Sequence, residues 1–331
     1  MKLPRRRFLR LALGAAALPA AARLASAQTY PQRPVKIIVS NIPGGLGFDL
    51  VARAVAERLS ARLNQPFIVE NRPGAAGNVG AEAVARSAPD GHTLLVALGS
   101  TFTINPSLYR KLPFDPQKDF KFIAIMATTS NMLVVHPSLP VKSVADLIAF
   151  ATAAAAKKQP IAYPSGGNGT PGHLLMENFR QQAGFEAIHA PYRGNPQLVI
   201  DLVAGQVKVG FVATTGVIQH VREGRLRGLA ISTRMRSPLA PDMLTIAEAG
   251  YPELEFESYT LLAAPAGIPG TISDLLEREV LQVLASPELQ EKFRAQDTMI
   301  TPMNAAQTRA RIEADAQIWA KVVKATGMRI D

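Results

Sequence analysis

Short apolar runs alternate with longer stretches of helical periodicity along most of the chain. Residues 35–40 form a compact apolar run of the kind that predicts a strand. In the next stretch, residues 49–63, an apolar side chain recurs at every fourth position: Val51, Val55, Leu59 and Leu63. That spacing aligns the side chains along one face of a helix. The order strand, turn, helix is the repeating unit of α/β architecture.

Further units of the same kind follow to the end of the chain. Strands are expected at residues 67–70, 93–98, 122–126, 132–135, 161–163, 187–190, 207–213, 226–232 and 256–264. Helices are expected at residues 78–87, 144–156, 172–182, 196–204, 273–284 and 304–326. The pattern restarts after a proline-spaced stretch, residues 105–119, and a crossing between two lobes is expected near residues 127–130. The sequence therefore predicts an α/β protein with largely parallel sheets.

The first 27 residues have the pattern of an export signal. Residues 5–10 give a basic start, residues 11–22 an apolar, alanine-rich stretch, and residues 25–27 a small-residue site, so cleavage is expected after Ala27. The apolar stretch is shorter than the roughly 20 residues that a membrane span needs. Paired arginines in the basic start resemble a twin-arginine signal, and an ordinary secretory signal is the alternative.

Removal of this segment changes the charge balance. The segment carries six basic residues and no acid, so cleavage lowers the formal net charge from +10 to +4. The remaining basic residues are scattered and only 6% of the residues are aromatic, so the interleaved basic and aromatic surface of a nucleic-acid-binding protein is missing. The chain has no cysteine, which excludes disulfides, thiolate metal sites and a cysteine nucleophile. A small anionic ligand fits this composition.

Two glycine-rich turns, residues 42–49 and 165–173, each follow a predicted strand and open a predicted helix. Backbone N–H groups at a helix start lack partners within the helix and lie at the positive end of its dipole, so each turn is a candidate site for a small anion. The turns are more than a hundred residues apart, which suggests two lobes closing on one ligand. Asp49 would repel an adjacent anion, so we expect it to organise the first turn.

The second turn also matches the pattern of a dinucleotide site. Gly167, Gly169 and Gly172 have the spacing G-x-G-x-x-G, and Glu186 stands where the ribose-binding acid would be. Against a nucleotide-dependent oxidoreductase, a proline lies inside the motif and the unit is in the middle of the chain.

A hydrolase is the second enzyme alternative, with His173 as base and Ser165 or Thr170 as nucleophile. No G-x-S-x-G elbow surrounds either hydroxyl, and no third residue stands out to orient the histidine. A hydrogen-bonding histidine near a helix start is the simpler interpretation. The other histidines show no paired metal-ligand spacing, so metal catalysis is not expected.

Two further segments could border a cleft. Arg193 follows the predicted strand 187–190 and could bind a ligand carboxylate through its bidentate fork, although a solvated surface arginine fits equally well. Residues 71–78 form a third glycine-rich stretch that opens a helix, and we interpret it as loop geometry.

Several segments together resemble one family. They are Pro43-Gly44-Gly45 with the run Asp49 to Arg53, ENRPGAAGN at 70–78, APDG at 88–91 with TLL at 93–95, PYRG at 191–194, AGQV at 204–207 and APAG at 264–267. In this order they are similar to the recurring segments of the Bug receptors, the periplasmic solute-binding proteins of tripartite tricarboxylate transporter systems. The resemblance spans essentially the whole chain after the signal.

The resemblance implies a periplasmic binding protein of type II, in which each lobe is a mainly parallel sheet flanked by helices and the ligand cleft lies between the lobes. Residues 28–128 and 251–331 would form lobe 1, and residues 129–250 lobe 2. A carboxylate would bind between the two turns. The ligand-binding residues that we predict are Ile42, Gly44, Gly45, Gly47, Phe48, Asp49, Ser100, Thr101, Ser165, Asn168, Gly169, Thr170, His173, Arg193, Ala213 and Thr214.

This chain departs from the family pattern at two places. Phe48 stands where threonine is usual, and residues 212–215 read Val-Ala-Thr-Thr where many members have an aspartate after the strand. Both changes are expected to make the pocket less polar. They favour a more apolar or aromatic carboxylate over amino-dicarboxylates and citrate.

The sequence as a whole predicts an extracytoplasmic receptor, not an enzyme, that captures a small organic carboxylate for uptake or sensing without cofactor or metal. The expected partners are membrane transporter subunits or a sensor protein, and no nucleic acid. A monomer is expected, because a capture protein needs a free cleft.

Overall fold

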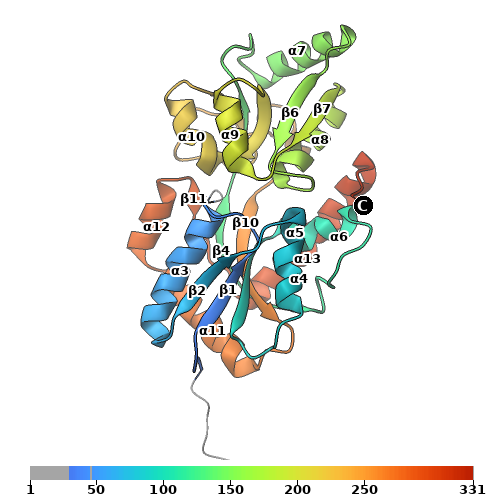
Figure 1. The fold of residues 1–331 in the computed structure, drawn as a ribbon. Coiled ribbons are helices and arrows are strands. Elements are labelled where there is room, and N and C mark those ends of the chain that lie inside the picture. The colour runs from blue at the N-terminus through green and yellow to red at the C-terminus, as the bar shows by residue number, and fades with distance from the viewer. Residues whose placement is uncertain (1–29, 45–46, 331) are drawn as a thin grey trace, which may run out of the picture.

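A mixed six-stranded sheet with helices on both faces forms the first lobe of the molecule (Figure 1). The computed structural model describes residues 30–44 and 47–330, so the predicted export signal at residues 1–27 and Gly45 lie outside the described residues. The strand order is β11-β4-β10-β3-β1-β2. The strands are β1 (Val35–Val39), β2 (Phe67–Asn71), β3 (Thr93–Leu98), β4 (Phe120–Thr129), β10 (Ser258–Pro265) and β11 (Thr298–Met299).

The helices of this lobe come from both ends of the chain. They are α3 (Phe48–Leu63), η1 (Ala75–Gly77), α4 (Asn78–Ala85), α5 (Ser100–Thr103), α6 (Asn105–Leu108), α11 (Gly270–Leu284), α12 (Pro287–Arg294) and α13 (Ala305–Thr326). We call these elements with the six-stranded sheet lobe 1. The tail therefore packs on the first lobe, as the family resemblance implied.

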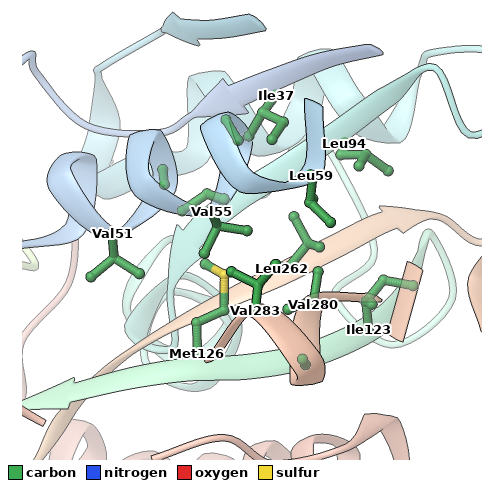
Figure 2. Packing of buried hydrophobic residues seen from close by; sticks show 14 of the residues in the cluster. Ile37, Val51, Val55, Leu59, Leu94, Ile123, Met126, Leu262, Val280 and Val283 are labelled. Carbon is green, nitrogen blue, oxygen red and sulfur yellow. The ribbon is translucent and has the colours of Figure 1, made fainter. Parts of the chain in front are cut away.

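The apolar stripe predicted on α3 forms part of the core of lobe 1. Val51, Val55 and Leu59 are buried in one cluster with Val280 of α11 (Figure 2). Leu63 is partly buried and packs against the same cluster. Helices α3 and α11 thus cover one face of the sheet, while α4 and α13 contribute to the cluster on the other face. Burial of alternate strand residues against both layers fixes the register of the strands.

Lobe 2 has two smaller sheets. The strands β5 (Asn131–Val135), β8 (Val209–Ala213) and β9 (Arg227–Ile231) form a sheet in the order β8-β5-β9, and β6 (Ile161–Ser165) pairs with β7 (Ala187–Pro191). Around them lie α7 (Val144–Ala156), α8 (Pro171–Ala183), α9 (Asn195–Val203), α10 (Thr214–Arg222) and η2 (Pro252–Leu254).

The expectation of mainly parallel sheets was wrong in detail. Strand β1 pairs in parallel with β2 and β3, and β6 pairs in parallel with β7. All other pairings between named strands are antiparallel. For β4 and β10 the reason is that β4 carries the chain out of lobe 1 and β10 brings it back, so these two neighbours run in opposite directions.

Two short segments connect the lobes. Strand β4 ends at Thr129 and β5 begins at Asn131, so the first crossing falls close to the predicted residues 127–130. On the way back, Leu254 is still buried in the core of lobe 2, and β10 begins only at Ser258. We therefore propose that lobe 2 extends to about residue 256 and not only to residue 250.

The lobes also pack against each other beside the crossings. Leu174 of α8 is fully buried in a cluster with Ile104, Leu108, Trp319 and Val323 of lobe 1. This apolar contact ties the second glycine-rich turn, which precedes α8, to the C-terminal helix. In the described part of the chain, no helix has the length and apolar character of a membrane span.

Candidate functional site

A cleft of about 630 Å³ lies between the lobes, where the turns that follow β1 and β6 face each other. Lobe 1 contributes residues 40–42, 73–77, 98, 100, 101, 109 and 330 to its lining. Lobe 2 contributes residues 166–168, 170, 171 and 192–194. The two turns predicted from sequence thus border one cavity.

Asp49 organises the first turn. Its carboxylate is buried and accepts hydrogen bonds from the Gly44 N–H (3.1 Å), from Arg53 Nε (2.8 Å) and from Asn71 Nδ2 (2.7 Å). Burial alone would raise the pKa of Asp49, but the hydrogen bonds and the Arg53 charge outweigh it, and the pKa lies below the usual range. The carboxylate is therefore charged, and its hydrogen bonds hold the turn. Because the Gly44 N–H donates to Asp49, it is not free to bind a ligand.

The second turn is held by a similar internal network. Ser165 is buried, accepts the Gly167 N–H (3.2 Å) and has its Oγ 2.6 Å from His189 Nε2. The Thr170 hydroxyl donates to the Gly167 carbonyl (2.7 Å). Ser165 therefore pairs with His189 and not with His173, the base of the hydrolase alternative. A buried hydroxyl that is bound on both sides is poorly placed to attack a substrate.

His173 is a supporting residue beneath this turn. Its Nδ1 accepts the Gly169 N–H at 3.2 Å, and its ring stacks on His189 with 3.9 Å between the ring centres. Burial, and then the neighbouring His189, lower the pKa of His173 to about 4, so the ring is neutral at pH 7. The neutral ring is required, because only an unprotonated Nδ1 can accept the amide.

Glu177 anchors the stack from below. It accepts the hydroxyl of Tyr163, whose ring stacks on His189, and pairs with Arg180 Nε at 2.7 Å. Hydrogen bonds from Arg180 and Tyr163 outweigh the effect of burial and lower the pKa of Glu177. The titratable groups behind the second turn are thus paired among themselves.

The third glycine-rich stretch, which the sequence placed as a possible border of the cleft and favoured as loop geometry, lines the cleft with residues 73–77. Ala75 and Ala76 adopt left-handed backbone angles, with φ of 45° and 50°. The Ala76 carbonyl accepts Thr101 Oγ1 (3.2 Å) and Asn105 Nδ2 (3.1 Å), which hold this conformation. The signal that could have found it was present: like the other two turns, it joins a strand to a helix through glycines.

Among the described residues that line the cleft, Arg193 is the single one with a charged side chain. It is exposed, and within the described residues no hydrogen bond or ion pair engages its guanidinium. Hydroxyl, amide and apolar groups make up the rest of the lining. A cavity whose described lining has one free cation and no carboxylate is suited to an anion.

The structure divides the predicted site residues into two groups. Those that line the cleft are Ile42, Ser100, Thr101, Asn168, Thr170 and Arg193. Those that lie behind or beside it are Gly44, Gly47, Phe48, Asp49, Ser165, Gly169, His173, Ala213 and Thr214. Gly45 is outside the described residues.

Thr214 belongs to a buried network at the crossing between the lobes. Its N–H donates to the Ser130 carbonyl at 3.0 Å and its hydroxyl lies 2.5 Å from Ser130 Oγ. Ser130 Oγ in turn donates to Asp297 of lobe 1 at 2.6 Å, and Ser237 of lobe 2 donates to the same carboxylate. Neither departure from the family pattern lines the cleft, so its apolar character comes from other residues, such as Ile42 and Leu98.

Comparisons with known proteins agree on one family. A model described as "Tripartite tricarboxylate transporter family receptor" matches residues 51–328. Protein BugT of Bordetella pertussis (strain Tohama I) is 36% identical over 306 residues, which cover 92% of this chain and 93% of BugT.

Two solved structures resemble about nine-tenths of the chain. R. palustris Rpa4515 with adipate has 33% sequence identity and a TM-score of 0.84, covering 91% of this chain and 99% of its own. MatC from Rhodopseudomonas palustris with bound malate has 25% identity and a TM-score of 0.81, covering 89% and 100%.

Proposed function

The chain belongs to the family of tripartite tricarboxylate transporter receptors, and from that premise we propose that its cleft captures a small organic carboxylate. The family and the two-lobed fold expected from the sequence are confirmed. The chain is accordingly a solute-binding receptor of the periplasmic type.

The observation that supports a carboxylate ligand is the unpaired Arg193 in a cleft whose described lining residues include no acid. A guanidinium matches a carboxylate in a bidentate fork, and the hydroxyls of Ser100, Thr101 and Thr170 line the same cavity. The acidic ligands in Rpa4515 and MatC support this chemistry. Apolar lining residues favour a carboxylate with an apolar or aromatic body.

Binding is proposed to close the lobes around the ligand. Hinge motion at the two crossings would bring the turns together. The ligand stabilises the closed form only through contacts that are stronger there than in the open form. Because the amides of Gly44, Gly167, Gly169 and Thr170 already have partners, side chains supply more of the binding than the amide-lined turns suggested by sequence.

The biological setting is part of the proposal. We propose that residues 1–27 are removed on export, by the twin-arginine or the general route. The mature receptor would act as a monomer that delivers its ligand to membrane transporter subunits or to a sensor protein. Binding and release need no bond to be broken, so neither an enzyme activity nor a cofactor is part of it.

A panel of mono- and dicarboxylates tests the function directly. The mature protein should show a rise in Tm and a heat of binding with at least one of succinate, adipate, benzoate and phenylacetate, because only the folded state binds the anion. Differential scanning fluorimetry followed by calorimetry measures both. Absence of any response, or a nucleotide cofactor that co-purifies with the protein, would argue against the receptor.

Gly169→Ala should impair closure. A Cβ at Gly169 would lie 2.8 Å from Leu108 Cδ2 and 3.6 Å from the Ala76 Cβ, both in lobe 1, and would hold the lobes apart. We expect the affinity for the best carboxylate of the panel to fall about tenfold or more, measured by calorimetry. Gly184→Ala is the matched control. Gly184 has a φ of 72°, close to the 78° of Gly169, but a Cβ added there would have no neighbour within 4 Å. Equal affinities of the two variants would contradict the closure model.

A further inference from the structure

The last described residues of the chain fold back onto lobe 1 beside the cleft. Helix α13 ends at Thr326 with Gly327 as its C-cap, and the following tail, residues 328–330, runs alongside residues 108–110. The Ile330 N–H donates to the Leu108 carbonyl at 2.9 Å, and the Ile330 carbonyl accepts the Arg110 N–H at 3.2 Å. Backbone pairing on both sides fixes the position of Ile330.

The side chain of Ile330 reaches both the cleft and the opposite lobe. Ile330 and its bridge partner Tyr109 line the cavity. Its Cδ1 would lie 3.5 Å from a Cβ at Gly169, so it approaches the second glycine-rich turn of lobe 2. Ile330 therefore lies where the two lobes meet at the ligand cavity.

Met328 of the same tail has a different role. It packs against the apolar cluster of Leu108, Leu174 and Trp319, as Ile330 does, but it does not line the cleft. Met328 thus contacts the core alone, whereas Ile330 contacts both the core and the cavity.

We propose that the C-terminal tail is a wall of the ligand cleft and that Ile330 limits the bulk of the carboxylate that the cleft accepts. The inference rests on the proposed function, because it concerns the same cavity. The wall is apolar and half-buried, so it contacts the hydrocarbon part of the ligand and not its carboxylate. A larger residue at this position removes volume from the cavity, and a smaller one adds it.

Two opposite substitutions in the mature chain test the wall. Ile330→Trp should weaken binding of the bulkier acids adipate and phenylacetate about tenfold or more relative to succinate, since a few extra carbons in a confined apolar site change affinity by that order. Ile330→Ala should shift the same ratio of dissociation constants in the other direction. Met328→Ala is the matched control and should leave the ratio within about twofold of the wild type.

The outcomes separate the two proposals. Unchanged selectivity in both Ile330 variants, with carboxylate binding retained, overturns the wall and leaves the receptor function standing. A shift of equal size in Met328→Ala also overturns it, because a general loosening of the tail would then explain the effect. A wild-type protein that binds no acid of the panel overturns the proposed function, and the wall with it.

Discussion

Arg193→Gln is expected to weaken binding of the best carboxylate about 30- to 100-fold, because the described lining of the cleft then has no cation for the anion. Glutamine keeps much of the length and a donor, so the loss reports the charge and the fork. The affinity of the Arg193→Lys protein should lie between those of the wild type and Arg193→Gln, since an ammonium keeps the charge but loses the bidentate geometry. Calorimetry on the three proteins measures the series.

Arg329→Gln separates direct contact from the general field of the protein. Arg329 precedes the cleft-lining Ile330 but does not itself line the cavity, and one of its guanidinium nitrogens lies 3.4 Å from the Ser107 carbonyl. Its removal should change the affinity less than about twofold at physiological ionic strength, where exposed charges are screened within about 8 Å. Similar losses in Arg193→Gln and Arg329→Gln would show that Arg193 acts only through long-range attraction.

Periodicity predicted the elements whose faces are buried. The stripe on α3 was identified from its fourfold spacing, and the bounds predicted for residues 144–156 agree with those of α7 (Val144–Ala156). Ser143 caps α7 by accepting the Asp146 N–H at 3.0 Å, which is a local signal of a helix start. Such features depend on neighbouring residues, so the sequence alone reveals them.

Two short helices were overlooked although their apolar residues have helical spacing. Helix α10 has Val217 and Val221 four residues apart, but it spans only nine residues and directly follows β8, so its short stripe is easily read as a continuation of the strand. Helix α12 is short, and its start after the capping Ser286 was overlooked. Strand direction was also missed, because an apolar run has no direction until its neighbours are known.

The site was predicted in outline but not in its chemistry. Glycine content identified the two turns correctly as neighbours of one cleft. The sequence predicted that Asp49 organises the first turn and that His173 forms a hydrogen bond near a helix start. It did not show that these bonds occupy the amides of Gly44 and Gly169, because that depends on the orientation of the side chains. Thr214 was assigned to the ligand, whereas its partner Ser130 lies 84 residues away in the sequence.

The G-x-G-x-x-G spacing has a structural explanation in this chain. Gly169 lies against Leu108 of the other lobe, and a Cβ on Gly172 would overlap the carbonyl oxygen of Phe211 in β8. In dinucleotide folds the third glycine likewise permits close contact of helix and strand. The same spacing arises here from the packing of α8 against β8, so it is no evidence for a nucleotide.

Gly172→Ala should therefore be among the most destabilising single substitutions in lobe 2. The obstructing atom is a backbone oxygen of the buried residue Phe211, so neither a rotamer change nor solvent can relieve the overlap. Forcing α8 away from β8 should cost about 3 kcal/mol, at the upper end of overpacking effects, and lower the Tm by roughly 5–10 °C. Denaturant unfolding followed by circular dichroism measures the loss.

Gly270→Ala is the control for this substitution. Gly270 also lies at a helix start, in α11, but an added Cβ would have no neighbour within 4 Å. Both substitutions replace glycine by alanine, which favours a helix interior by up to about 1 kcal/mol. Gly270→Ala should therefore be neutral or slightly stabilising. Since α8 carries the turn that lines the cleft, Gly172→Ala should also weaken carboxylate binding, whereas Gly270→Ala should not. A Gly172→Ala protein as stable as the Gly270→Ala protein would mean that α8 does not depend on this close approach to β8.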